Sequence, residues 1–539
     1  MLFIFAFIVS LVVTMVLIPP VMKWADKIGA IDIPDARKVH TQAIPRVGGI
    51  AMVAGSIASI LLLAELDQQV VSILVGFFVI LVFGIWDDKC DLNYKIKFLG
   101  QLLAVVIVVT WGDVVVRTFP FIDGQLPDYL AIPLTIFALV GITNAINLSD
   151  GLDGLAGGTS LISISIIALL AYDAKGEMVV LIAMAVAGSI LGFLRHNTYP
   201  ARLFMGDTGS QFLGFSLGVL VIVLSQSVNS AMSPLIPLFI LGLPILDTVA
   251  VMGQRMYEKR SLFSPDKNHI HHKLLALGLD HYEAVFLIYL LQSSFVTLAY
   301  FMMYESDSLL SLIYIGVSLL VLAMFHLASM SNWKLSNVQV KHSSIINQAV
   351  NYLRVKGWLV LVPTYLLSIL IPFLMILPAI YTDNVSLDLA LLAVLLLVVL
   401  VLSLIVRLNN FSLLEKSVVY IVSVMAVYQL NTFAPYEGAM SVINVLYLVL
   451  VVAFAVRIRF SNDNEFKVTP LDYLVIGLMI VVPNLPEAQL SDSAIGEMAV
   501  KLVVMFYTVE AVMGMGVKSR YLIRFGVITA LLVSAVRGF

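Results

Sequence analysis

The chain has 539 residues, of which 60% are hydrophobic and only 12% are charged. Soluble proteins carry roughly 25% charged residues, so a chain of this composition would expose large apolar areas to water and aggregate. A soluble enzyme, a secreted disulfide scaffold, a coiled coil and a disordered chain are therefore excluded. The net charge of −3 gives no basis for nucleic-acid binding, and a single cysteine, Cys90, excludes an internal disulfide and a cysteine-rich zinc site.

Apolar runs long enough to cross a bilayer as helices follow one another along the chain. The first, at 2–22, lacks a basic segment and a small-residue cleavage site, and is expected to be an uncleaved span. Ten more spans are predicted near 47–65, 69–86, 98–116, 130–146, 155–172, 178–194, 209–225, 234–253, 284–302 and 309–327.

A polar stretch at 331–356 follows, which is predicted to be a cytoplasmic linker. About seven further spans are predicted near 357–379, 386–406, 415–431, 439–456, 470–484, 498–516 and 521–537. The predicted fold class is thus an all-α polytopic membrane protein with about 18 transmembrane helices. Its predicted domains are a membrane domain at 1–330, the linker, and a transmembrane extension at 357–539.

The distribution of Lys and Arg predicts the orientation of these spans. If the N-terminus lies outside and the spans alternate, all but about four of the 31 Lys and Arg residues fall on the inside, as the positive-inside rule requires. We therefore expect a multi-pass protein of the bacterial inner membrane.

Four inside loops of the first eleven spans carry dense polar clusters, whereas a single such loop would be a solvated connector. These loops read WDDKCDLNYKIK (86–97), NAINLSDGLDGLAGG (144–158), RHNTYPARLFMGDTGS (195–210) and QRMYEKRSLFSPDKNHIHHKLLALG (254–278). Because all four lie on one face, they predict one composite site at the cytoplasmic surface.

The carboxylates of these loops predict a bound cation. Asn147, Asp150 and Asp153 are three residues apart, which places them on one stripe if the segment is helical. Carboxylates this close repel one another unless a cation intervenes, and oxygen ligands favour Mg²⁺. The alternative is that the carboxylates only pair with Lys95, Lys97 and Arg202.

A metal held by carboxylates beside a basic, histidine-rich loop predicts a phosphorylated substrate. The string His269-Ile270-His271-His272 is a poor metal site, because alternate residues of a strand and adjacent residues of a helix point in different directions. Contact with phosphate or sugar is the favoured interpretation, and a zinc site is the alternative. Asp207 follows Gly206 just before a span, where a helix N-terminus can face an anion.

Taken together, these motifs resemble the polyprenyl-phosphate N-acetylhexosamine-1-phosphate transferases. The similarity lies in Asp87-Asp88, NLSDGLDGLAGG (147–158), PARLFMGDTGS (200–210), SPDKNHIHH (264–272) and the upstream IPRVGGI (44–50), and it covers about residues 1–330. The phospho-N-acetylmuramoyl-pentapeptide transferase of peptidoglycan synthesis is a sibling with a bundle of ten or eleven helices, so the resemblance implies such a bundle here, followed by about seven extra helices.

The resemblance also implies a role for each matching residue. Asp207 and Asn147 match the Mg²⁺ ligands, with Mn²⁺ as the alternative ion. Asp87 matches a residue that deprotonates or orients the lipid phosphate. The further residues implied as catalytic are Asp88, Lys97, Asp150, Asp153, His269, His271 and His272, and those implied to bind substrate are Gly151, Leu152, Asn197, Phe204, Arg260 and Lys267.

The implied reaction joins undecaprenyl phosphate to the sugar phosphate of a UDP-N-acetylhexosamine and releases UMP. The form of the SLFSPDKNHIHH segment favours N-acetylglucosamine as the sugar, with N-acetylgalactosamine or a 6-deoxy amino sugar as alternatives. This reaction would be the first membrane step of cell-surface polysaccharide synthesis. A homodimer and later glycan-assembly enzymes are candidate partners.

The extension departs from the family pattern, and two other functions compete with the transferase. It has no paired carboxylates and no histidine cluster, but it carries Lys501 and Glu510 within one apolar run. A secondary transporter would place its charges near the bilayer midplane of inverted repeats, whereas here the first half keeps them at one surface. A catalytically inactive transferase half that serves as a scaffold is the other alternative, and the complete set of motifs disfavours it.

Overall fold

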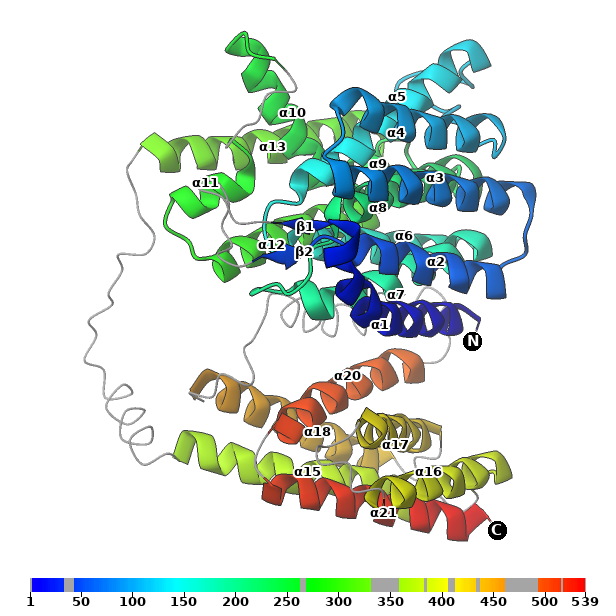
Figure 1. Cartoon of the computed structure of the whole chain (residues 1–539), viewed down its shortest axis with the longest axis vertical. Helices are drawn as coiled ribbons and strands as arrows, with labels where there is room; N and C mark the ends of the chain where they lie inside the picture. Colours follow the sequence, from blue (N-terminus) through cyan, green and yellow to red (C-terminus); the bar gives the residue numbers. More distant parts are fainter. Residues whose placement is uncertain are drawn as a thin grey trace. The chain divides into compact units, whose positions relative to one another are not determined.

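The computed structural model describes residues 2–32, 43–261, 268–330, 358–381, 385–405, 413–432, 437–460, 493–514 and 517–538. The chain divides into two compact units: Met1–Gln339 with Thr469–Leu471, and Val340–Val468 with Asp472–Phe539. Within the described residues both units are built almost entirely of helices, which confirms the predicted all-α class (Figure 1).

The first unit contains a helix for nearly every span that the sequence predicts before residue 330. In chain order its elements are α1 (Leu2–Ile28), β1 (Ile31–Asp32), β2 (Ile44–Pro45), α2 (Gly48–Leu63), α3 (Gln68–Cys90), α4 (Tyr94–Thr110), α5 (Asp128–Ser149), α6 (Leu155–Asp173), α7 (Glu177–Asn197), α8 (Gly206–Val223), the π-helix η1 (Leu224–Val228), α9 (Ile236–Ile240), α10 (Gly242–Tyr257), α11 (Ile270–Ala276), α12 (His281–Phe301) and α13 (Asp307–Met330).

Helix α8 lies at the centre of this unit. Every residue from Thr208 to Val223 is buried, and the helix packs against α2, α3, α5 and α6. Apart from Asp207 and Gln211, its side chains are apolar or small, as expected for a helix without a solvent or lipid face. Since α8 is enclosed by four helices, the residues of its first turn are surrounded by the ends of its neighbours.

A short antiparallel ribbon, which the sequence does not predict, holds the segment that leads into α8. Strand β1 pairs with β2, and β2 continues into contacts with the segment before α8. The backbone N–H of Phe204 donates to the Pro45 oxygen at 2.8 Å, and Gly48 N–H donates to the Phe204 oxygen at 2.9 Å. These contacts fix the start of α8 relative to α2.

The single span predicted at 234–253 is wrong, because the structure breaks it at Leu241 into α9 and α10. Pro237, Gly242 and Pro244 lie around the break. A proline lacks the N–H that an interior helical position requires, but it fits the first turn of a helix, so the chain ends one helix and starts another.

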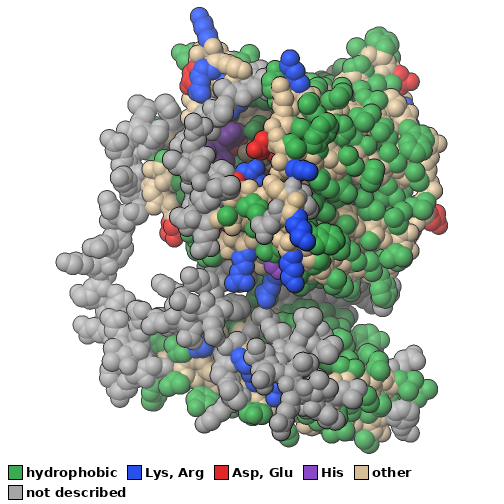
Figure 2. Space-filling view, viewed as in Figure 1, with side chains coloured by type: hydrophobic (Ala, Val, Ile, Leu, Met, Phe, Trp, Pro, Cys, Tyr) green, Lys and Arg blue, Asp and Glu red, His purple; other side chains and the backbone are tan. Residues whose placement is uncertain are grey.

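Ten described helices are long and apolar enough to cross a membrane, and four shorter helices are apolar. The first unit also exposes large hydrophobic side chains such as Leu62, Phe78 and Phe137, which are 71%, 59% and 78% exposed. Figure 2 shows hydrophobic side chains over much of its visible face. The structure thus confirms a polytopic membrane protein. The predicted span at 470–484 and the whole linker predicted at 331–356 fall outside the described residues.

The second unit contains α15 (Trp358–Tyr381), α16 (Leu387–Ile405), α17 (Leu413–Thr432), α18 (Glu437–Phe460), α20 (Ser493–Gly514) and α21 (Val517–Gly538). Helix α15 packs against α17, α18, α20 and α21 around a core of aliphatic side chains. Lys501 is buried in α20, with its Nζ 6.0 Å from the centre of the Tyr447 ring. The side chain of Glu510 lies outside the described residues.

The crossing of α2 and α8 yields a prediction about stability. A Cβ atom on Gly49 would lie 2.3 Å from the backbone nitrogen of Gly209, so Gly49→Ala requires the two helices to separate. We expect a loss of about 1–3 kcal/mol, measured as a lower thermal denaturation midpoint of the purified protein. Gly141→Ala in α5 is the control, because nothing lies within 4 Å of its added Cβ. Equal midpoints for the two variants would contradict the close packing of α2 and α8.

Candidate functional site

The ends of four helices meet around the carboxylate of Asp207, which lies in the first turn of α8. Asp207 Oδ1 accepts a hydrogen bond from Asn147 Nδ2 of α5 at 3.0 Å, and Oδ2 lies 3.1 Å from Lys97 Nζ of α4. The same Lys97 Nζ lies 2.7 Å from Asp87 Oδ2, near the end of α3. The structure therefore brings together four of the residues that the sequence selects, although they are up to 120 positions apart.

Asp88 faces a different partner from its neighbour Asp87, because adjacent residues of a helix point about 100° apart. Its Oδ1 accepts from Asp207 N–H at 2.7 Å, and its Oδ2 accepts from Thr208 N–H at 3.2 Å and from Thr208 Oγ1 at 2.6 Å. The side chain thus caps the N-terminus of α8. The sequence predicts Asp88 as a catalytic partner of Asp87, whereas the structure places its carboxylate where it holds Asp207.

Gly206 allows this close approach of α3 and α8. Its φ of +68° is in the left-handed region, and an added Cβ would lie 2.5 Å from the Asp88 carboxylate oxygens. A larger residue would therefore be strained and would also displace the cap.

A pair of amides sets the register of α4 against α5, one helical turn from Lys97 and Asn147. Asn144 Nδ2 donates to Gln101 Oε1 at 2.7 Å, and Gln101 is buried. Because a turn of helix is about four residues, this pair fixes which residues of α4 and α5 reach Asp207.

The connection between α5 and α6 carries four of the predicted residues, Asp150 to Asp153. Asp153 Oδ2 accepts from the Ala201 N–H at 2.9 Å, and Leu152 is buried. Asn197 is buried as well. Its Oδ1 accepts from Gly154 N–H at 2.9 Å and its Nδ2 donates to the Leu203 oxygen at 2.9 Å. Asp153 and Asn197 therefore tie the 150–154 segment to the 198–205 segment, which also contains Phe204.

Asp150 marks a concentration of negative charge. Its side chain is open to solvent on one side, but the surrounding protein and the charges of Asp207, Asp153 and Asp88 raise the pKa of its carboxyl to about 7. A carboxyl whose pKa is raised by neighbouring carboxylates lies where a cation would be stabilised.

The three predicted histidines lie at and in α11, a helix that the sequence does not predict. His269 precedes its first residue, and both His269 and His271 are buried. His271 covers Gly151, where an added Cβ would lie 2.2 Å from its Nε2. Burial and the adjacent His272 lower the pKa of His271 to about 3, so its imidazole is neutral at pH 7 and does not supply the positive charge that the sequence suggests for this loop.

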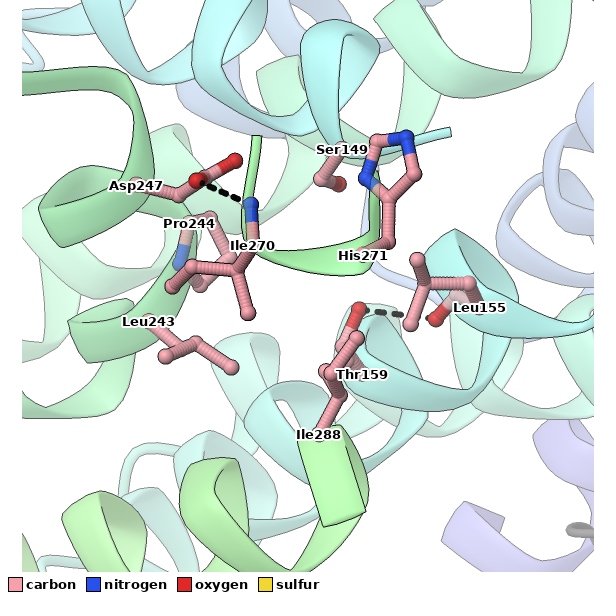
Figure 3. A pocket seen from close by; sticks show the side chains of 9 residues that line it. All are labelled: Ser149, Leu155, Thr159, Leu243, Pro244, Asp247, Ile270, His271 and Ile288. Carbon is pink, nitrogen blue, oxygen red and sulfur yellow. Dashed lines mark hydrogen bonds between the residues drawn. The ribbon is translucent and has the colours of Figure 1, made fainter. Parts of the chain in front are cut away.

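A pocket opens beside His271, between α6, α10, α11 and α12 (Figure 3). Five of the nine lining residues are apolar and four are polar, and Thr159 lies away from Asp247, on the side of Ile288. The lining residues are Ser149, Leu155, Thr159, Leu243, Pro244, Asp247, Ile270, His271 and Ile288.

Two of the predicted site residues are not placed beside Asp207 or the histidines. Arg260 follows α10, where its exposed guanidinium pairs with Glu258 at 3.0 Å. Lys267 falls outside the described residues.

Sequence reasoning missed Asp247 and Thr208. Asp247 is a buried carboxylate within an otherwise apolar run, ILGLPILDTVAV, and an ionisable residue inside such a run is itself a signal of a special role. Thr208 carries no such signal, because its hydroxyl is identified only by its contact with Asp88.

The residues around Asp207 fit a hard divalent cation that takes few ligands from the protein. Nowhere in the described part of the chain do three or more His, Cys, Asp or Glu side chains form a group that could hold a metal ion, so a closed cage is not built there. Mg²⁺ commonly takes one or two carboxylates and completes its octahedron with water and substrate phosphates. The Asp207 side chain is 27% exposed, and a half-turn of the Asn147 amide would present its oxygen.

The cap on α8 yields a prediction. Asp88→Asn leaves one acceptor oxygen for three donors and removes a charge, and hydrogen bonds to charged groups contribute about 1.5–3 kcal/mol each. We therefore expect a clearly lower thermal denaturation midpoint. Thr208→Val, which removes only one of the three bonds, should cost less, and Thr208→Ser should be close to the wild type. A midpoint of Asp88→Asn equal to the wild type would show that Asp88 does not stabilise α8.

Comparison with known proteins identifies relatives of this chain. Residues 70–225, which include Asp87, Lys97, Asn147 and Asp207, match the model of glycosyl transferase family 4. Among curated proteins, the chain is 44% identical over 289 residues to the probable undecaprenyl-phosphate N-acetylglucosaminyl 1-phosphate transferase of Bacillus subtilis (strain 168). That match covers 53% of this chain and 81% of the relative.

Two further relatives come from distant bacteria. The decaprenyl-phosphate N-acetylglucosaminephosphotransferase of Mycobacterium tuberculosis is 34% identical over 303 residues, which is 50% of this chain and 75% of the relative. The undecaprenyl-phosphate alpha-N-acetylglucosaminyl 1-phosphate transferase of Escherichia coli (strain K12) is 31% identical over 274 residues, which is 49% and 74%. The chain therefore belongs to the family of polyprenyl-phosphate N-acetylglucosaminyl 1-phosphate transferases.

Proposed function

We propose that this protein transfers N-acetylglucosamine 1-phosphate from UDP-N-acetylglucosamine to undecaprenyl phosphate, releasing UMP. The observation that carries the proposal is the meeting of Asp87, Lys97, Asn147 and Asp207 at four helix ends, in a chain similar to transferases named for this reaction. A site at the end of membrane helices suits a reaction between a lipid and a water-soluble nucleotide, since each substrate approaches from its own phase.

The reaction forms one bond and breaks one. An oxygen of the lipid phosphate attacks the sugar-linked phosphorus of the donor, and the bond to the UMP oxygen breaks, so that UMP leaves with that oxygen. Lys97 neutralises charge on the phosphates, and it also keeps the carboxylates of Asp87 and Asp207 next to each other. Asp87 orients the lipid phosphate, which needs little deprotonation because a phosphate monoester is already mostly ionised at pH 7.

Asp207 and Asn147 would hold the Mg²⁺ in this scheme, and Mn²⁺ would fit the same oxygen ligands. When bound, the ion would offset the negative charge of the two phosphate groups and of the surrounding carboxylates. The raised pKa of Asp150 supports a cation in this position.

The donor lies on the side of the 150–153 segment and α11. Gly151, Leu152 and Phe204 would contact the nucleoside, and Asp150 and Asp153 would line its site. Asn197 contributes by fixing the backbone of both segments. The histidines would contact the sugar and the diphosphate.

The remaining features of the proposal concern the cell. The site faces the cytoplasm of the bacterial inner membrane, the N-terminus lies outside and the chain crosses about 18 times. The product starts a cell-surface polysaccharide. The second unit at 357–539 is auxiliary to phosphotransfer and interacts with later glycan-assembly enzymes, and the chain forms a homodimer. The positions of Lys and Arg support the orientation with the N-terminus outside and the site facing the cytoplasm.

The first test of the function uses purified protein, undecaprenyl phosphate, Mg²⁺ and a panel of UDP-sugars, with UMP release as the measurement. Asp207→Ala should lower kcat more than about a hundredfold, the range for losing an electrostatic stabiliser of a transition state, and should remove the dependence on Mg²⁺. Asp113→Ala, at an exposed aspartate paired with Arg117, is the control. Absence of turnover with every donor would refute the function, and a wild-type rate for Asp207→Ala would refute the metal assignment.

The second test concerns the extension. Because residues 1–339 form a compact unit apart from Thr469–Leu471, a protein ending at residue 339 should retain phosphotransfer within about threefold of the full chain, a change of roughly 0.6 kcal/mol in activation free energy. The measurement is again UMP release, with gel filtration to verify that the shortened protein is folded. A folded but inactive protein would show that the extension is part of the catalytic machinery.

A further inference from the structure

Asp247 and His269 form a buried pair that the reaction scheme above does not use. Asp247 lies in α10 and is 7% exposed, and His269, which precedes α11, is 5% exposed. Asp247 Oδ2 lies 2.7 Å from His269 Nδ1, and Asp247 Oδ1 accepts from the Ile270 N–H at 2.8 Å. One carboxylate therefore holds both a side chain and the first N–H of α11, and Figure 3 shows its hydrogen bond to Ile270.

Burying the Asp247 carboxylate in α10 costs free energy of folding. A buried charge is costly unless it is paired and hydrogen-bonded, and Asp247 is 7% exposed in the mostly apolar first half of α10. An apolar residue of similar volume would pack there at lower cost. The presence of Asp247 is therefore explained by its contacts with the His269 side chain and the Ile270 N–H rather than by the stability of α10.

The contact also determines the tautomer of His269. An ionised carboxylate can only accept hydrogen bonds, so the imidazole nitrogen that faces it, Nδ1, carries the proton. In the neutral imidazole Nε2 is then an acceptor, as in other histidines that are oriented by a carboxylate.

The orientation of His269 constrains that of His271, because their imidazole rings are stacked. The two rings are nearly parallel, with an interplanar angle of 9° and centroids 5.8 Å apart. His271 also contacts Gly151, with no room for a Cβ between them, and its ring centroid lies 4.3 Å from that of His272. His271 is thus held by His269, by His272 and by the 150–153 segment.

We propose that Asp247 is a positioning residue of the transferase: it fixes the tautomer and the plane of His269, and through the stacked rings it holds His271 at the donor side of the site. The inference rests on the proposed function, which it extends by assigning the support of the histidines to one residue of α10. The burial that keeps His271 neutral suits it to hydrogen bonding with uncharged groups of the sugar.

The test is a double-mutant cycle in the full-length protein, measured as kcat/KM for UDP-N-acetylglucosamine. Asp247→Asn keeps an acceptor for the Ile270 N–H but loses the anionic partner of His269, and loss of such an orienting partner typically costs 10–100-fold. His269→Gln should cost a similar factor. If Asp247 acts through His269, the double variant will be no slower than the slower single variant.

Thr248→Val is the matched control. Thr248 is adjacent to Asp247 and similarly buried, and its hydroxyl has no hydrogen-bond partner among the described residues. We expect wild-type kcat/KM for this variant. A loss comparable to that of Asp247→Asn would show that any change at this position of α10 disturbs the site, and would overturn the assignment to Asp247.

A spectroscopic measurement separates this inference from the function itself. In protein labelled with ¹⁵N at histidine, the nitrogen signals of His269, identified by their loss in His269→Gln, should be those of the Nδ1–H tautomer and should change in Asp247→Asn. Unchanged signals, or fully additive losses in the cycle, would overturn the inference. If the wild type transfers no sugar phosphate, the proposed function fails, and the spectra still decide whether Asp247 fixes the tautomer of His269.

Discussion

The carboxylate of Asp88 beneath the first N–H groups of α8 is the interaction on which the geometry of the site depends. The N-terminus of a helix leaves N–H groups without partners and carries partial positive charge. In a helix buried on all sides these groups cannot be satisfied by water, so a side chain must supply the acceptors. Asp88 does so, and because it binds the N–H of Asp207 itself, the same contact fixes the residue around which the other polar groups gather.

A second constraint is the balance of charge around Lys97. Its ammonium lies between Asp87 and Asp207, so two carboxylates share one partner. Asp87 is buried, whereas Lys97 and Asp207 are 28% and 27% exposed, so losing one member costs less than the roughly 3–5 kcal/mol of a fully buried pair. Two carboxylates and one ammonium leave these three groups with a net negative charge when all are ionised.

The histidines are held in a different way, by packing and by the single carboxylate of Asp247. His271 is buried between His269 and Gly151, so it is neutral. His271 therefore adds no positive charge, whereas the Lys97 ammonium lies between the carboxylates of Asp87 and Asp207.

The sequence by itself determined the membrane class, nearly all the helices of the first unit and the residues that gather at Asp207, because hydrophobic length and clustered charges depend only on local composition. It could not decide the break at Leu241, the helix α11 or the roles of adjacent side chains. Asp87 and Asp88 are equivalent in the sequence, and only the position of α8 against α3 turns one toward Lys97 and the other toward a helix N-terminus. Tertiary structure decides such roles because they depend on how separate helices pack, and the partners of Asp88 lie more than 100 residues away, which no local pattern records.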